Sequence, residues 1–506
     1  MSNIFPPVRD YNIKTKNPQI QIYGHRIYKD QTLYEYLLEF LTIFISPKGK
    51  GDYTDLADTA FTLTVPTDGE KLYYYPSPNM GLKRFVFFNR SDQEKRFDID
   101  KEALKQHREQ LAHYIVIENE NYTEEFAINA LQDLLYGFNS IVGKRSWFAQ
   151  SLLPLSPEIV FCESIGNQKE RTLMKMDDYI DNRTPIDSKF NFDQHMFMAR
   201  GGEVYYLHLV QGLNMVEESY RKCLSQELKK LVTNIPQLSK IATFVQSKWE
   251  DTMDEEKPKA KLHYIKKTTE IIPSEYSKYA PFTVDELSNI LTSELDPFEK
   301  IELVGVLIPI QIMRIMSGRA SQVLNLANTQ EWLIDLTKDS KGVIRKRAVQ
   351  SYEQFEENVF RAIHEADFDG YKTANPKQQD DTKIIMAAAK DTNLLVRKLG
   401  KEIGLIIPLK GPNMRFSLNE NLVKVLVMSL IKPGERIMFT TFLQKCYKHF
   451  NIIIGPKEAA IHFSEEPTYL VAFNENEQLF LEMLKNSGFL RNLSDATSIV
   501  ENPFRR

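Results

Sequence analysis

The residues best suited to chemistry stand together at Arg200, Gly201 and Gly202, just before a predicted helix that starts near Glu203. Free amides at the start of a helix can bind an anion, and the neighbouring guanidinium would add positive charge. The pattern therefore predicts an anion- or phosphate-binding site. The alternative is that the two glycines only allow a tight turn into a packed helix. The full phosphate-loop pattern, with Lys and Ser or Thr after the glycines, is absent from the sequence, so we do not expect ATP hydrolysis.

Metal-dependent chemistry would need several acidic, His or Cys side chains that converge on one ion. Four such residues lie near one another in the sequence: Asp193, His195, Glu203 and His208. Their spacing matches no motif with a known mechanism, so we predict no metal ion, no cofactor and no catalytic residue. The alternative is a divergent metal-dependent nuclease in the N-terminal half, to which acidic residues such as Glu158 and Glu163 could contribute.

A third group of residues suits contact with nucleic acid. A helix predicted at 440–450 has one apolar face and one polar face that carries cations. In a helix-turn-helix arrangement the corresponding helix enters the major groove, and nearby cations neutralise phosphates. The candidates for DNA contact are Arg415, Arg436, Lys445, Lys448 and His449. Three acidic residues of the predicted wing would repel DNA: Glu458, Glu465 and Glu466. A protein-binding module and a transcriptional regulator are the two alternatives for this region.

The elements that must position these residues are mostly helices, because apolar residues recur at spacings of three and four. Helices are predicted near 31–44, 101–114, 123–142, 205–216, 220–232, 284–294, 298–316, 319–337, 343–365, 383–401 and 419–431. Strands are predicted at 19–29, 61–65, 84–88, 452–454 and 468–473. The expected fold class is mainly α with minor β (α+β).

The chain of 506 residues is too long for one compact core, so several domains are expected. The charged and proline-containing stretch at 251–283 predicts a linker or surface loop. It would separate an N-terminal α+β domain at 1–250 from a helical domain at 284–404. The pattern at 405–506 is compatible with a winged-helix-like C-terminal module.

The bulk composition restricts the class of protein. The net charge is -4, so the chain as a whole lacks the basic character of a protein that binds DNA unaided. Three cysteines far apart in sequence argue against both a thiolate zinc site and a disulfide scaffold. The first residues are polar, and the apolar run from Leu33 to Ile45 is too short to span a bilayer. These features predict a cytoplasmic protein without membrane contact.

Two sets of segments resemble large bacterial proteins encoded within anti-phage defence or DNA-modification islands. The first set is KEIGLIIPLKGPNMRFSLNENLVKVLV (401–427), FLQKCYKHFNIIIGP (442–456) and LSDATSIVENPF (493–504). The second set is SWFAQSLLPLSPEIVF (146–161) and ARGGEVYYLHL (199–209). The resemblance implies a role in defence beside ATPases, helicases, nucleases or methyltransferases supplied by other chains, and it brings no catalytic residues with it.

Taken with the missing nucleotide motif, this resemblance leads to our main hypothesis. We expect a non-catalytic scaffold or DNA-engaging subunit of a bacterial multi-protein anti-phage defence system. Its expected partners are other proteins of that system and, through the C-terminal module, double-stranded DNA. A nuclease subunit of such a system and a winged-helix transcriptional regulator are the alternatives.

Overall fold

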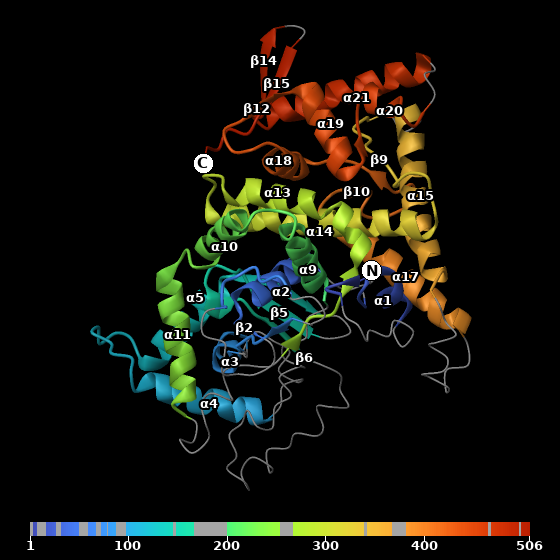
Figure 1. The fold of residues 1–506 in the computed structure, drawn as a ribbon. Helices are drawn as coiled ribbons and strands as arrows, with labels where there is room; N and C mark the ends of the chain where they lie inside the picture. The colour runs from blue at the N-terminus through green and yellow to red at the C-terminus, as the bar shows by residue number, and fades with distance from the viewer. Residues whose placement is uncertain are drawn as a thin grey trace.

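The structure is a computed structural model that describes residues 4–7, 17–26, 32–49, 59–66, 72–77, 79–87, 98–144, 148–165, 200–252, 267–338, 342–366, 381–463, 467–494 and 497–505. In these residues the fold is mainly helical with small sheets, which confirms the coarse fold class (Figure 1). The named α-helices are α1 (Pro18–Tyr23), α2 (Leu33–Ile45), α3 (Met80–Phe87), α4 (Asp98–Ala112), α5 (Glu124–Tyr136), α9 (Gly201–Leu213), α10 (Glu218–Val232), α11 (Pro236–Glu250), α13 (Ala280–Leu291), α14 (Pro297–Val323), α15 (Val343–His364), α17 (Asp381–Glu402), α18 (Glu420–Leu430), α19 (Phe439–Phe450), α20 (Pro456–Ala459) and α21 (Pro467–Asn486).

The strands are short and form small separate sheets. They are β1 (Ile4–Phe5), β2 (Lys48–Gly49), β3 (Tyr73–Tyr74), β4 (Asn139–Lys144), β5 (Phe148–Leu152), β6 (Cys162–Ile165), β7 (Lys267–Thr268), β8 (Ile272–Pro273), β9 (Trp332–Leu333), β10 (Ile406–Ile407), β11 (Arg415–Phe416), β12 (Arg436–Met438), β13 (Ile452–Ile453), β14 (Leu490–Ser494) and β15 (Thr497–Glu501). Several pairings join distant segments, such as β1 with β8 and β9 with β13. The sheets therefore tie parts of a helical fold together.

Helix α14 is the central element and lies between the N-terminal and C-terminal helices (Figure 1). Asp296 caps it by accepting a hydrogen bond from the Phe298 amide at 2.8 Å, and Pro297 occupies its first position. The helix packs against α2, α13, α15 and α18. Among the described helices it alone is long and apolar enough to cross a membrane. However, 89% of its most apolar stretch is buried inside the fold, as in the core helix of a soluble protein.

The hydrophobic core is continuous across the stretch at 251–283, where the sequence predicts a linker. Helix α13 packs on α9, and α14 packs on α2, so the central helices share their core with the N-terminal region. Part of the stretch is itself regular structure, because β7 and β8 pair with β3 and β1. Residues 253–266 lie outside the described part of the chain. The four segments proposed from composition stay a prediction about the organisation of the chain.

The C-terminal region combines three main helices with a three-stranded antiparallel sheet. Helix α18 leads into β12, then α19, and, after the short β13 and α20, into α21 and the β14–β15 hairpin. Strand β15 lies between the other two, in the order β12-β15-β14. The ring of Phe480 in α21 lies 6.1 Å from the rings of Phe439 and Phe442 in α19. The two helices therefore share one core beside the sheet (Figure 1).

The structure corrects several predicted elements. Residues 19–23 of the predicted strand at 19–29 belong to α1, which is capped by the Asn17 side chain. The predicted strands at 84–88 and 468–473 lie largely or wholly within α3 and α21, and the predicted strand at 61–65 is irregular. The predicted helix at 319–337 ends early, because α14 stops at Val323 and the chain continues into β9. In α3 all side chains are buried, so its sequence has no period to tell a strand from a helix.

Candidate functional site

The structure brings Arg200, Gly201 and Gly202 together with a buried acidic side chain of the same chain. Arg200 has a left-handed backbone, with φ 67°, and directly precedes α9. The carboxylate of Glu39, from α2, accepts hydrogen bonds from the amides of Arg200 at 2.8 Å and Gly202 at 2.7 Å. Glu39 is 1% exposed, so a buried carboxylate satisfies the start of this helix. Binding of an external anion here stays a prediction, and it would require Glu39 to withdraw.

The two glycines allow α2 and α9 to approach closely. A Cβ atom on Gly201 would lie 1.2 Å from a ring carbon of Tyr36, and one on Gly202 would lie 2.2 Å from the Tyr36 carbonyl oxygen. No larger residue fits at either position without moving α2. In this structure the glycine pair therefore serves close packing of α2 and α9, which was the alternative to an anion-binding role.

A group of acidic side chains surrounds Arg200. The guanidinium lies 2.9 Å from the carboxylate of Glu270 and 3.5 Å from that of Glu203. Burial, and next the nearby Glu203, raise the pKa of Glu39 to about 8, which outweighs the opposite effects of the two amides and of Arg200. Burial also raises the pKa of Glu203. Folding therefore favours the protonated form of these carboxyl groups.

Replacing Glu39 by glutamine should remove a pH dependence of stability. The pKa of Glu39 rises from an ordinary value of 4.5 to about 8 on folding, so the stability that it contributes is complete below about pH 4.5. That contribution is lost as the pH rises through about 8. The free energy of unfolding is measured in urea for the wild type and for Glu39→Gln. Between about pH 4.5 and 8 the wild-type value should fall relative to that of the variant, and above about pH 8 the two values should keep a constant difference. A free energy of unfolding that stays constant or rises with pH for the wild type relative to Glu39→Gln would contradict the assignment.

The cations predicted on α19 make contacts within the protein. The ammonium of Lys445 donates to the carbonyl of Leu430, the last residue of α18, at 2.8 Å. The ammonium of Lys448 lies 5.7 Å from the ring centre of Phe282 in α13. His449 is half-buried and takes part in a network with α13 and α14. DNA contact through this helix stays a prediction, and these contacts do not favour it.

The two predicted arginines outside α19 differ in exposure. The Nε atom of Arg415 donates to the carboxylate of Asp335 at 2.6 Å, and the arginine side chain is 13% exposed. Arg436 pairs with Glu501 at 3.1 Å, and its side chain is 54% exposed. Arg491, which no sequence pattern singled out, also pairs with Glu501 and is 61% exposed. Strand pairing brings Arg436 and Arg491 together, and Arg415 lies in a different sheet.

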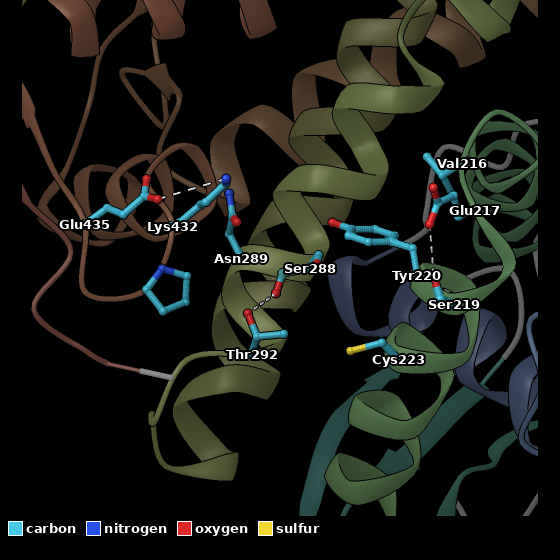
Figure 2. A pocket seen from close by; sticks show the side chains of 11 residues that line it. Val216, Glu217, Ser219, Tyr220, Cys223, Ser288, Asn289, Thr292, Lys432 and Glu435 are labelled. Carbon is cyan, nitrogen blue, oxygen red and sulfur yellow. Dashed lines mark hydrogen bonds and ion pairs between the residues drawn. The ribbon is translucent and has the colours of Figure 1, made fainter.

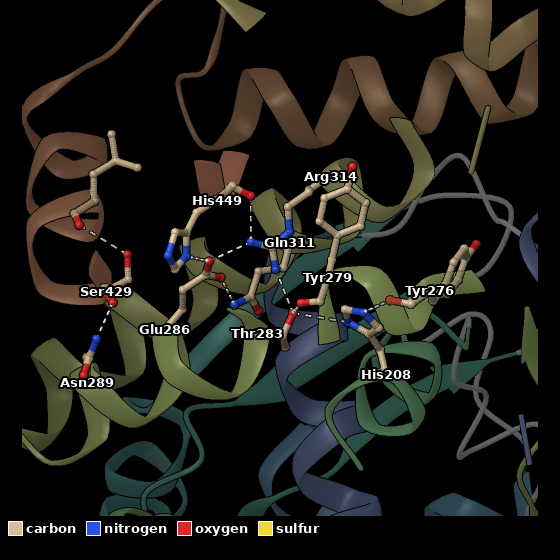
Figure 3. Close-up of polar contacts among 11 residues, drawn as sticks. His208, Tyr276, Tyr279, Thr283, Glu286, Asn289, Gln311, Arg314, Ser429 and His449 are labelled. Atoms are coloured by element: carbon tan, nitrogen blue, oxygen red, sulfur yellow. Dashed lines mark hydrogen bonds and ion pairs between the residues drawn. The ribbon is translucent and has the colours of Figure 1, made fainter. Parts of the chain in front are cut away.

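A buried polar network joins α13, α14 and α19 (Figure 3). The Arg314 guanidinium donates to the Glu286 carboxylate at 2.6 Å, and both side chains are 0% exposed. The same carboxylate accepts from Gln311 at 2.6 Å and from His449 at 2.7 Å. Burial alone would raise the pKa of Glu286, but Arg314 and His449 together hold it below its usual value. Arg314 also reaches the carbonyl of His449 at 3.1 Å, so the pair fixes α19 against the central helices.

The network continues to α9 through a neutral histidine (Figure 3). Burial lowers the pKa of His208 to about 3, so the ring carries one proton. Its Nε2 lies 2.9 Å from the Tyr276 carbonyl and must donate, which leaves Nδ1 as an acceptor for the Thr283 hydroxyl at 3.2 Å. That hydroxyl accepts in turn from Arg314 at 2.7 Å. The network connects three regions of the sequence, and it leaves the Nε of Arg314 and the Oε1 of Gln311 buried without a hydrogen-bond partner.

A polar cavity of about 630 Å³ lies where α10, α13 and the turn before β12 meet (Figure 2). Tyr220 and Cys223 line it from α10, Asn289 from α13, and Lys432 from the turn. Lys432 lies 4.0 Å from the carboxylate of Glu435, so its charge is balanced within the cavity. The cavity is a polar gap between three regions of the chain, and none of its lining residues was predicted to form a site.

The residues considered for metal binding are not assembled by the described part of the chain. Within those ranges no three His, Cys, Asp or Glu side chains are grouped so as to hold a metal ion. Asp193 and His195 lie outside the described residues, as does the side chain of Glu163. Glu158 accepts a hydrogen bond from the Ser156 hydroxyl at 2.8 Å. The nuclease hypothesis stays a prediction without a site in the described residues.

Comparison of the chain with protein-family models, with curated proteins and with solved structures finds no match.

Proposed function

We propose that this chain is a non-catalytic subunit of a bacterial multi-protein anti-phage defence system, and that it works in the cytoplasm by connecting other proteins of that system. In this proposal residues 405–506 form a winged-helix-like module that binds protein. The proposal combines the resemblance to proteins of defence islands with the chemistry of one exposed surface, the outer face of α21.

The outer face of α21 carries the main support. Within residues 469–486 its exposed side chains are Leu470, Val471, Asn474, Glu475, Gln478, Glu482, Lys485 and Asn486. The valine is 68% exposed and the leucine 37%. The face thus has two acidic residues, one cation and two exposed aliphatic side chains. Phosphate binding requires an excess of cations, whereas a protein interface combines apolar contacts with polar groups at its rim.

The order of elements makes α21 the relevant helix for this question. A helix-turn-helix reads DNA with its second helix. The main elements of this region follow in the order α18, β12, α19, α21 and the β14–β15 hairpin, so α19 and α21 would be the two helices of the motif and α21 would be the one that reads DNA. From its cations, the helix at 440–450 (α19) was predicted to have this role, and a strand was predicted at 468–473, where the structure has the first turns of α21. With α21 in this position, Glu475 and Glu482 would face the phosphates. This arrangement favours a protein partner over DNA.

Replacing Val471 by aspartate should separate the chain from its partners. A buried carboxylate at the centre of an apolar contact is strongly unfavourable, whereas at an exposed position it has little effect on folding. The measurement is the mass of the complex isolated after co-expression of all proteins encoded in the same locus. Leu409→Asp is the matched control, because Leu409 is 66% exposed and lies far from α21 in sequence. An unchanged mass with Val471→Asp would argue against the proposal.

A second candidate function, DNA contact, is favoured by one observation. Arg436 and Arg491 lie on the two outer strands of the C-terminal sheet, share Glu501, and leave one positive charge at an exposed edge. Such residues bind phosphates without reading sequence. Fluorescence anisotropy with duplex DNA decides between the candidates. Binding that is weakened by Arg436→Ala with Arg491→Ala would support DNA engagement, and no binding at physiological salt would support the assembly role.

A further inference from the structure

Exposed apolar side chains gather on the connection between α4 and α5 and along α5 itself. Tyr114, Val116 and Tyr122 of the connection are 52%, 88% and 50% exposed. Phe126 and Leu134 of α5 are 54% and 51% exposed. Soluble proteins seldom leave such side chains together at the surface without a function. This segment projects at the edge of the fold opposite the C-terminal helices (Figure 1).

Helix α5 is apolar on two faces. Its inner face buries Ile128 and Leu135 in the core. Its outer face exposes Phe126, Ala130 and Leu134, which are spaced four residues apart and therefore form a ridge along the helix. The ring of Tyr122 stacks on that of Phe126 at 4.8 Å and extends the ridge by one turn. A ridge of this spacing is the surface against which a second helix packs.

The charge around this ridge is negative. Between Tyr114 and Gly143 the sequence contains no Lys or Arg, and its acidic residues there are Glu118, Glu120, Glu124, Glu125 and Asp133. Two cations from neighbouring helices reach the segment. Arg108 donates to the side chain of Asn129 at 2.7 Å, and Lys248 lies over the ring of Tyr114 at 3.6 Å and pairs with Asp251. The remaining negative charge would repel nucleic acid, anionic lipid and a second copy of the same surface.

We propose that the acidic ridge, defined as Tyr122, Phe126, Ala130 and Leu134 with the neighbouring Glu125 and Asp133, is the docking site for a cationic amphipathic helix of a partner protein. This proposal rests on the assembly function proposed above and names the chemistry of one partner. Leucine-type side chains of the incoming helix pack on the ridge, and its Lys and Arg residues pair with the acidic side chains. Opposite charge sets the partner and its orientation, and the apolar ridge supplies affinity.

The test uses two synthetic peptides of the same Leu and Lys composition, titrated against the full-length chain by fluorescence anisotropy. One peptide has its leucines on a single helical face, and the other has them scattered around the helix. The patterned peptide should bind more tightly than the scattered one. Phe126→Ala with Leu134→Ala should weaken its binding by about tenfold or more, because two apolar anchors are lost. Leu409→Ala is the control and should bind like the wild type.

Other outcomes overturn the proposal. Equal binding of both peptides, or unchanged binding by the double variant, would show that only charge attracts them. Duplex DNA or anionic vesicles that bind the wild type but not the double variant would assign the ridge to a different partner class. A dimer in sedimentation that the double variant abolishes would assign it to self-association. Peptide binding is measured on the purified chain and needs no anti-phage activity. The docking proposal can therefore be tested even if the proposed defence function proves wrong.

Discussion

Replacing Arg314 by methionine should lower the free energy of unfolding by about 3–5 kcal/mol, because it leaves the carboxylate of Glu286 buried without its main counter-charge. Both side chains are 0% exposed and lie 2.6 Å apart. Methionine fills much of the space of the arginine side chain. The lowered free energy of unfolding would therefore come from the lost charge and not from a cavity. The measurement is urea denaturation followed by circular dichroism. His449 should become more exposed at the same time, since Arg314 also holds its carbonyl.

Two further variants make this expectation specific. Arg314→Met combined with Glu286→Met removes both charges and should be clearly more stable than Arg314→Met alone. Glu357→Ala removes an exposed pair with Arg361 at 3.9 Å and should change the free energy of unfolding by less than about 1 kcal/mol. If Arg314→Met had as small an effect as Glu357→Ala, the buried network would not hold α19 against the central helices.

Replacing Gly202 by alanine should cost about 3 kcal/mol or more, because the added methyl group cannot be placed without separating α2 from α9. Its Cβ would lie 2.2 Å from the Tyr36 carbonyl oxygen and 2.6 Å from the Phe40 amide nitrogen. Both are backbone atoms of a packed helix, so neither can move aside alone. The same shift would pull the Glu39 carboxylate away from the start of α9. Urea denaturation measures the loss.

Gly305→Ala provides the matched control for this prediction. Gly305 also lies in a helix of the core, but a Cβ there would be 3.4 Å from its nearest neighbour, a methyl group of Leu33. Alanine is favoured over glycine within a helix by about 0.5–1 kcal/mol, so this variant should be neutral or more stable. Equal tolerance of alanine at Gly202 and Gly305 would mean that α2 and α9 do not pack as closely as described.

Local sequence signals predicted helices best where one face is polar or a cap is present. The helix at Val343–His364 has an exposed face and follows its apolar spacing. The helix at Leu33–Ile45 is buried on all sides but starts at a capping box of Thr32 and Glu35, and Asn419 caps α18 at the start of the helix predicted at 419–431. The start of α1 also had a usable signal, because Asn17 and Pro18 form a capped helix start, but the alternation after it was read as a strand. Helix α3 had no such contrast, since its side chains are all buried.

The polar contacts of the site could not be predicted from spacing, because they join residues far apart in the chain. Glu39 and Gly202 are 163 positions apart, as are Glu286 and His449. A weaker signal was present in the apolar surroundings of two of these residues. Glu39 lies in the run from Leu33 to Ile45, and Arg314 lies in the apolar middle of α14. A lone charge in a buried helix must find a partner in the fold, but the sequence does not say which one.

The network and the ridge imply different mechanical roles for the C-terminal helices and for α5. The C-terminal helices are fixed to α13 and α14 by buried pairs, so their outer face has a defined position relative to the core. The acidic ridge lies at the opposite edge (Figure 1). A chain with two exposed surfaces of different chemistry can hold two different proteins at once, which is what an assembly subunit requires.

Plaque formation on cells that carry the complete locus tests the assembly function most directly. We expect protection against phage with the wild type and with Leu409→Asp. We expect loss of protection when the chain is deleted or carries Val471→Asp. The wild type, Leu409→Asp and Val471→Asp should all unfold at the same urea concentration, so the loss would not come from unfolding. Protection that persists without the chain, or that persists with Val471→Asp, would contradict a role in which this protein acts by holding others together.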